Sequence, residues 1–167
     1  MTENTHLDPS TLGFMTVAAV SLPLAFVMFQ GTDTTQGLGF FVPAGIILML
    51  VGLLAWKCNA NFGFAVFTLV GLAVFLSGST AYPIGEWGNI VFGIIFVFAI
   101  VWSVLIGAGK NLTLLLVTTA LIFLLLGIAS ITSTDLNTVV GVVALLNFIL
   151  NFYMGMSCAC PEKIKPF

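Results

Sequence analysis

The chain has 167 residues, of which 60% are hydrophobic and only 6% are charged, and its mean hydropathy is +1.21. A soluble domain of ordinary composition carries about 25% charged residues, so this composition excludes a water-soluble fold and predicts the lipid bilayer as partner. Four basic residues and a net charge of -2 also exclude nucleic acid as a partner, because they give no patch that could neutralise phosphates.

Long apolar runs dominate the sequence, and each is close to the 20 or so residues that a helix needs to cross a bilayer. None of them contains Asp, Glu, Lys, Arg or His. In chain order they are Leu12–Phe29, Gly39–Trp56, Phe62–Ser79, Trp87–Ile106, Leu112–Ile131 and Thr138–Met156. They predict an all-α polytopic membrane protein, with six transmembrane helices in a single bundle spanning 12–156. Residues 1–11 and 157–167 are expected to form tails.

The charged residues between the runs indicate the orientation. Basic residues follow the second, fourth and sixth runs, and acidic residues follow the first, third and fifth. The basic residues are Lys57, Lys110, Lys163 and Lys165, and the acidic residues are Asp33, Glu86 and Asp135. Because basic loops stay in the cytoplasm, we expect both tails to be cytoplasmic and the chain to be a multi-pass protein of the plasma membrane. No cleaved signal peptide is expected, since no Lys or Arg precedes the first run.

The residues that usually carry catalysis or bind metals are scarce. His6 is the sole histidine and falls in the N-terminal tail, so no base is available inside the fold, and we expect the chain not to be an enzyme. Cys58, Cys158 and Cys160 have no fourth ligand to complete a zinc site. We therefore predict neither a metal nor a cofactor.

Uncharged polar side chains interrupt the apolar runs. Most hydroxyl groups in such helices, including those of Thr68 and Thr119, are expected to bond to their own backbone or to a neighbouring helix. Asn147 and Asn151 are four residues apart and so share one face of the last helix. An unpaired amide in hydrocarbon costs several kcal/mol. These amides should therefore face either a partner helix or a water-filled lumen, and both readings remain open.

Two segments resemble signatures of the acetate uptake transporter family. Asp8-Pro9-Ser10-Thr11-Leu12-Gly13-Phe14 is similar to its N-P-A-P-L-G-L motif, with matches at Pro9, Leu12 and Gly13. Asn61-Phe62-Gly63-Phe64, followed by Phe67-Thr68 and Gly71, looks like its G-N-x-F-G and F-T-x-Y-G stretches, with Phe62 and Gly63 as signature positions.

This resemblance implies a six-helix bundle that assembles as a hexamer, with a separate solute pathway in each protomer. The family's pathway is narrowed by a Phe in the first helix, a Tyr in the third and a Leu in the fifth. By position these correspond to Val17, Val70 and Thr119, so none of the three is retained. The resemblance therefore implies a constriction with smaller, partly aliphatic side chains.

The leading hypothesis is a channel-like permease for acetate and related short monocarboxylates, in which protonation of the substrate itself supplies any dependence on protons. The expected pathway residues are Val17, Thr68, Val70, Thr119, Asn147 and Asn151. A urea- or amide-type channel is the first alternative. A membrane scaffold without transport activity is the second, and it would bury these residues against one another and leave no path.

Overall fold

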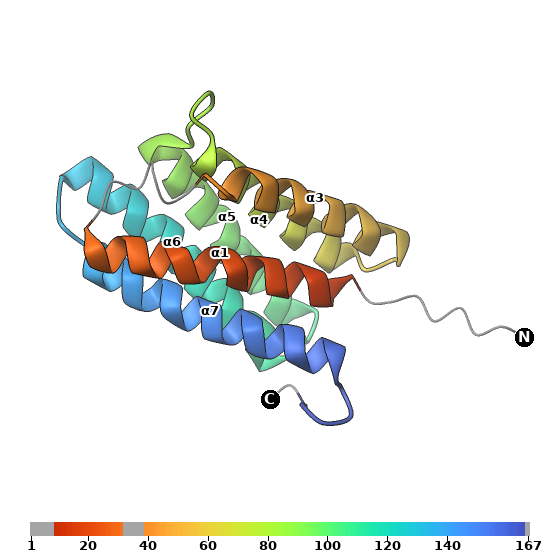
Figure 1. Cartoon of the computed structure of the whole chain (residues 1–167). Helices are drawn as coiled ribbons and strands as arrows, with labels where there is room; N and C mark the ends of the chain where they lie inside the picture. Colours follow the sequence, from red (N-terminus) through yellow and green to blue (C-terminus); the bar gives the residue numbers. More distant parts are fainter. Residues whose placement is uncertain (1–8, 32–38, 166–167) are drawn as a thin grey trace, which may run out of the picture.

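The computed structural model describes residues 9–31 and 39–165, and all regular structure within them is α-helical (Figure 1). The helices are α1 (Ser10–Gln30), α3 (Phe41–Lys57), α4 (Asn61–Gly78), α5 (Gly85–Leu105), α6 (Lys110–Thr132) and α7 (Asn137–Ala159). Each contains one of the six apolar runs almost completely, so the predicted all-α architecture is confirmed. His6, Asp8 and Asp33 lie outside the described residues, as does most of the expected N-terminal tail.

Five of these helices are long and apolar enough to cross a membrane. The exception is α3, which has 17 residues and therefore rises only about 26 Å, slightly less than the hydrocarbon thickness of about 30 Å. The boundaries predicted for the tails remain predictions, because they describe positions relative to a membrane.

The helices form a ring. Each helix packs on its neighbours in the sequence, and the first helix, α1, packs on the last, α7. Three antiparallel pairs, α3 with α4, α5 with α6 and α1 with α7, pack most extensively. Figure 1 shows α1 and α7 side by side, although they are furthest apart in the sequence. Contacts of α6 with α7, of α1 with α3 and of α4 with α5 complete the ring, and the last of these is the least extensive.

Close approach within the pairs depends on small residues. A Cβ atom on Gly45 of α3 would lie 2.6 Å from the backbone oxygen of Gly71 on α4, and one on Gly71 would lie 2.8 Å from the backbone oxygen of Gly45. In lipid, such contact between backbones is a main source of helix association, because lipid chains are as apolar as the side chains. These glycines therefore hold α3 and α4 closer together than any other residue would allow.

The charges lie at the two ends of the bundle. Lys57 and Lys110 lie at the end where α1 begins, which we call the lysine end. Glu86 and Asp135 lie at the opposite end, which we call the acidic end. Which end faces the cytoplasm remains a prediction from the loop charges.

Candidate functional site

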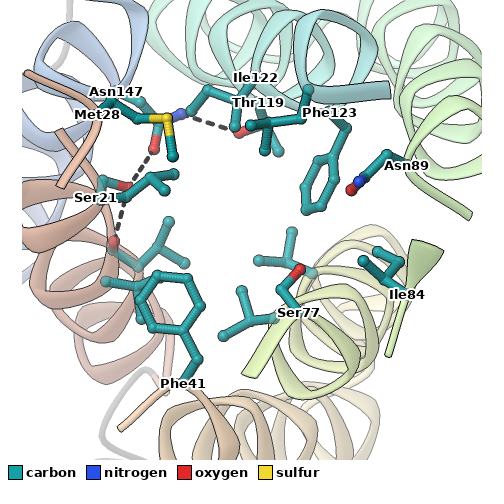
Figure 2. Close-up of a pocket in the computed structure, with 16 residues that line it drawn as sticks. Ser21, Met28, Phe41, Ser77, Ile84, Asn89, Thr119, Ile122, Phe123 and Asn147 are labelled. Carbon is teal, nitrogen blue, oxygen red and sulfur yellow. Dashed lines mark hydrogen bonds between the residues drawn. The ribbon is translucent and has the colours of Figure 1, made fainter. Parts of the chain in front are cut away.

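A cavity of about 190 Å³ lies on the axis of the ring. Every helix of the ring contributes to its wall (Figure 2). It extends from the middle of the bundle, at Val17 and Val70, towards the acidic end, at Met28 and Phe41. Its lining residues are Val17, Val20, Ser21, Leu24, Met28, Phe41, Val70, Val74, Ser77, Ile84, Asn89, Thr119, Ile122, Phe123, Leu126 and Asn147. Because none of these is ionisable, the cavity is an apolar chamber with a few neutral polar groups.

Asn147 of α7 forms the centre of the polar wall. Its Oδ1 accepts hydrogen bonds from Ser21 Oγ at 2.7 Å and from Asn151 Nδ2 at 2.9 Å. Its Nδ2 donates to Thr118 Oγ1 at 2.8 Å and to Thr119 Oγ1 at 2.9 Å. The amide is only 1% exposed, and these bonds join α1, α6 and α7. Asn147 thus faces partner helices and the cavity at once.

Four of the six predicted pathway residues line this cavity: Val17, Val70, Thr119 and Asn147. Asn151 does not, because it lies one turn further towards the lysine end and is fully buried. Thr68 does not either, since it packs against Gly52 at the interface of α3 and α4, where its Oγ1 is buried without a partner. That these residues form a solute pathway remains a prediction.

On the lysine side of the two valines, two aromatic side chains are buried between α1 and α4. Phe14 and Phe67 lie three residues from Val17 and Val70 on the same helices, and both are buried. Their rings meet edge to face, with centroids 5.3 Å apart and an interplanar angle of 66°. The ring of Phe67 also occupies the space beside Gly13, which a Cβ atom would fill. This aromatic pair lies on the lysine side of the cavity, and the sequence did not single it out.

Asn89 of α5 was also missed by the sequence analysis. It follows the sequence Gly-Glu-Trp-Gly at the start of a helix, where an asparagine is typical of a turn or cap. In the structure it is half-buried, and Figure 2 shows its carboxamide pointing towards the cavity. Its Oδ1 is buried and has no hydrogen-bond partner. Only the three-dimensional arrangement reveals this orientation.

The signature residues lie away from the cavity, at the lysine end. Pro9 is the residue before α1, and Leu12 is half exposed on that helix. Gly13 accommodates the ring of Phe67. Phe62 packs edge to face on Trp102 of α5, with centroids 5.1 Å apart, and Gly63 lies near Ala55 of α3. These residues shape contacts between helices rather than the chamber itself.

Metal ligation has no support in the described part of the chain, where no group of three His, Cys, Asp or Glu side chains could hold an ion. Cys58 and Cys158 line an open groove at the lysine end, together with Lys57. Neither forms a disulfide within the described residues. The cysteines therefore lie apart from the cavity.

Comparison with known proteins gives a likeness in fold. No family model matches the sequence, and no curated protein does either. Among solved structures, a bacterial acetate channel, SatP, matches with a TM-score of 0.78 and 20% sequence identity, covering 95% of each chain. The predicted resemblance to acetate transporters is thus confirmed at the level of the fold. The chain is an integral membrane protein whose fold resembles that of this channel.

Proposed function

We propose that the chain is a channel for acetate and related short monocarboxylates. The observation that carries this proposal is the axial cavity, which is apolar and contains uncharged hydrogen-bonding groups, in a fold shared with an acetate channel. The apolar walls suit a short alkyl group, and the neutral polar groups suit a carboxyl group. An apolar chamber also holds water and inorganic ions poorly, which favours small organic solutes.

The neutral acid is the form that this chamber favours. Moving an ionised carboxylate into an apolar environment is far more costly than moving its protonated form. No cationic side chain among the lining residues would offset that cost. Protonation of the substrate itself would therefore couple its flux to pH without a protonatable group in the channel wall.

A pH series tests this coupling. A carboxylic acid with a pKa of about 4 to 5 is almost wholly ionised at neutral pH, so each further pH unit lowers the neutral fraction about tenfold. We expect the acetate flux into proteoliposomes at fixed total acetate to fall by about that factor between pH 6 and pH 7. A flux that is independent of pH would contradict passage as the neutral acid, while leaving open transport of the anion.

The substrate class is tested by comparing labelled acetate, urea and succinate in the same proteoliposomes, with empty liposomes as the control. We expect acetate to pass faster than succinate, because the chamber is small and apolar. Urea passing faster than acetate would favour the amide-type channel. No flux of any solute above that of empty liposomes would favour the scaffold.

The proposed pathway uses the four lining residues directly: Val17, Val70, Thr119 and Asn147. Asn151 would support Asn147 through their hydrogen bond, and Thr68 would act only through the packing of α3 on α4. Phe14 and Phe67 form a buried pair one turn from Val17 and Val70, towards the lysine end, and we propose that their rings separate when a solute passes. The aromatic pair is therefore the proposed closed gate.

We also propose a homo-hexamer in the plasma membrane, with both termini in the cytoplasm. Apolar side chains cover the outer face of α5, among them Val97, Phe98 and Val101, which are 43–69% exposed and suit either lipid or a neighbouring copy. Native mass spectrometry in mild detergent should give six copies. A monomer alone under those conditions would contradict the hexamer without affecting the channel within each chain.

A further inference from the structure

The hydroxyl groups of the cavity are already engaged. Ser77 Oγ donates to the backbone oxygen of Ala73 at 2.8 Å, and Thr119 Oγ1 donates to that of Leu115 at 2.9 Å. Ser21 Oγ lies within bonding distance of two acceptors, the backbone oxygen of Val17 and Asn147 Oδ1. Each hydroxyl has a single hydrogen. These side chains can accept a bond from a solute but have no free hydrogen to donate.

The Asn147 amide is likewise engaged on both sides. Its oxygen accepts two hydrogen bonds, and its NH2 group donates to two threonine hydroxyls. An amide offers two donor hydrogens and an acceptor with two lone pairs, so this set satisfies it. A solute could bind to Asn147 only by displacing bonds within the bundle.

Asn89 is different, because the oxygen of its carboxamide is buried without a hydrogen-bond partner. The carboxamide also points towards the cavity (Figure 2). A buried polar group left unpaired destabilises a structure by about 1–3 kcal/mol, and native structures seldom retain one without a reason. The chamber's volume of about 190 Å³ is well above the 10–15 Å³ or so that a single water requires, so a small solute has room beside it.

We propose that the Asn89 carboxamide determines the specificity of the cavity by pairing with the carboxyl group of a short, neutral carboxylic acid. Once the carboxamide turns enough to bring Oδ1 to the cavity surface, the acid O–H donates to Oδ1 and Nδ2 donates to the acid's carbonyl oxygen, so one planar pair forms two hydrogen bonds. This assignment rests on the proposed function and adds to it the group that recognises the solute.

The geometry also selects against other solutes. An ionised carboxylate has no hydrogen to donate, so its anionic oxygen and Asn89 Oδ1 would be two acceptors facing each other. The apolar side chains near this end of the cavity, among them Ile84 and Phe123, leave the alkyl group in contact with hydrocarbon. A dicarboxylic acid would place its second carboxyl group against those walls.

The test compares Asn89→Leu and Asn89→Ala with wild type in proteoliposomes loaded with equal amounts of folded protein. Asn137→Leu is the matched control, because Asn137 is an exposed asparagine at the same end of the bundle and outside the cavity. The measured quantities are the acetate concentration at half-maximal flux and the maximal flux. A purely structural residue would change the maximal flux through the amount of folded channel, and would leave the half-saturating concentration unchanged.

Both Asn89 variants should raise the half-saturating concentration about tenfold, which corresponds to the loss of two neutral hydrogen bonds. The Asn137→Leu protein should behave as wild type. An unchanged half-saturating concentration in either Asn89 variant that folds and transports would overturn the role of Asn89 and leave the proposed function standing. No acetate flux through wild type would overturn the proposed function, and the role of Asn89 with it.

Discussion

Replacing Asn147 by leucine should destabilise the bundle by only a moderate amount, although Asn147 forms four side-chain hydrogen bonds to other side chains. Each of its partners keeps a backbone acceptor. Ser21 can donate to the oxygen of Val17 at 2.9 Å, and Asn151 Nδ2 to the backbone oxygen of residue 147 at 2.9 Å. Thr118 and Thr119 both already donate to the oxygen of Leu115 at 2.9 Å. No donor is therefore orphaned by the substitution.

The magnitude follows from the number of bonds lost. Side-chain hydrogen bonds within membrane bundles contribute about 0.6 kcal/mol each on average, so losing four lowers the free energy of unfolding by about 2 to 2.5 kcal/mol. Burial of the new leucine side chain adds little stability, since in the unfolded state within the membrane the same side chain would contact equally apolar lipid. If the partners were orphaned instead, each would add about 1–3 kcal/mol to this loss.

Equilibrium unfolding in mixed micelles measures this change, and Asn137→Leu again serves as control for the same substitution at an exposed site. A double-mutant cycle between Ser21→Ala and Asn147→Leu should give a coupling of about 0.6 kcal/mol. A loss above about 5 kcal/mol would refute the reasoning, because it would mean that the backbone acceptors do not compensate. A loss near zero would show that the network does not form.

Four further predictions test other parts of the structure. Val70→Ala should raise acetate flux and lower the acetate-to-succinate flux ratio if Val70 narrows the path, whereas an unchanged ratio with reduced thermal stability would mean that it only packs between helices. Phe67→Ala should raise flux in proteoliposomes by opening the proposed gate, and a flux equal to that of wild type would place the gate elsewhere. Gly71→Ala should lower unfolding stability by about 1–3 kcal/mol by separating α3 from α4, while Gly39→Ala, where a Cβ atom meets nothing within 4 Å, should leave it unchanged. For the orientation, a thiol reagent added to inverted vesicles should label Cys58 in the wild-type protein, with Cys58→Ser as the control that lacks this site. Labelling of Cys58 from outside intact cells would reverse the assigned topology.

The helices could be predicted from the sequence because span length is set by the bilayer and no run contains a charge. What the runs could not indicate is which helices become neighbours. α1 pairs with α7 through contacts such as Phe29 beside Gly141 and Met15 beside Gly155, and no local pattern connects residues so far apart. The short extent of α3 was also not evident, since its apolar run continues from Gly39 before the helix begins at Phe41.

The candidate site was predicted in part for a similar reason. Asn147 was identified because an amide inside an apolar run must find a partner, and this argument holds for any fold. The same argument could not distinguish Asn147, which faces the cavity, from Asn151, which is buried beyond it. Phe14 and Phe67 were missed because the chain has 16 phenylalanines, and composition does not tell which of them meet in the interior.

The pairing of α1 with α7 has a consequence for biogenesis. Among the described helices, α1 leaves the ribosome first and α7 leaves last, so α1 must wait in the bilayer for its main partner while α3 to α6 are inserted. During that interval Ser21 has only its own backbone to bond to, and the chamber has no wall on the side of α7. A nascent chain arrested before α7 should therefore be open to lipid and to quality-control proteases, and the arrival of the last helix both completes the chamber and ends that exposure.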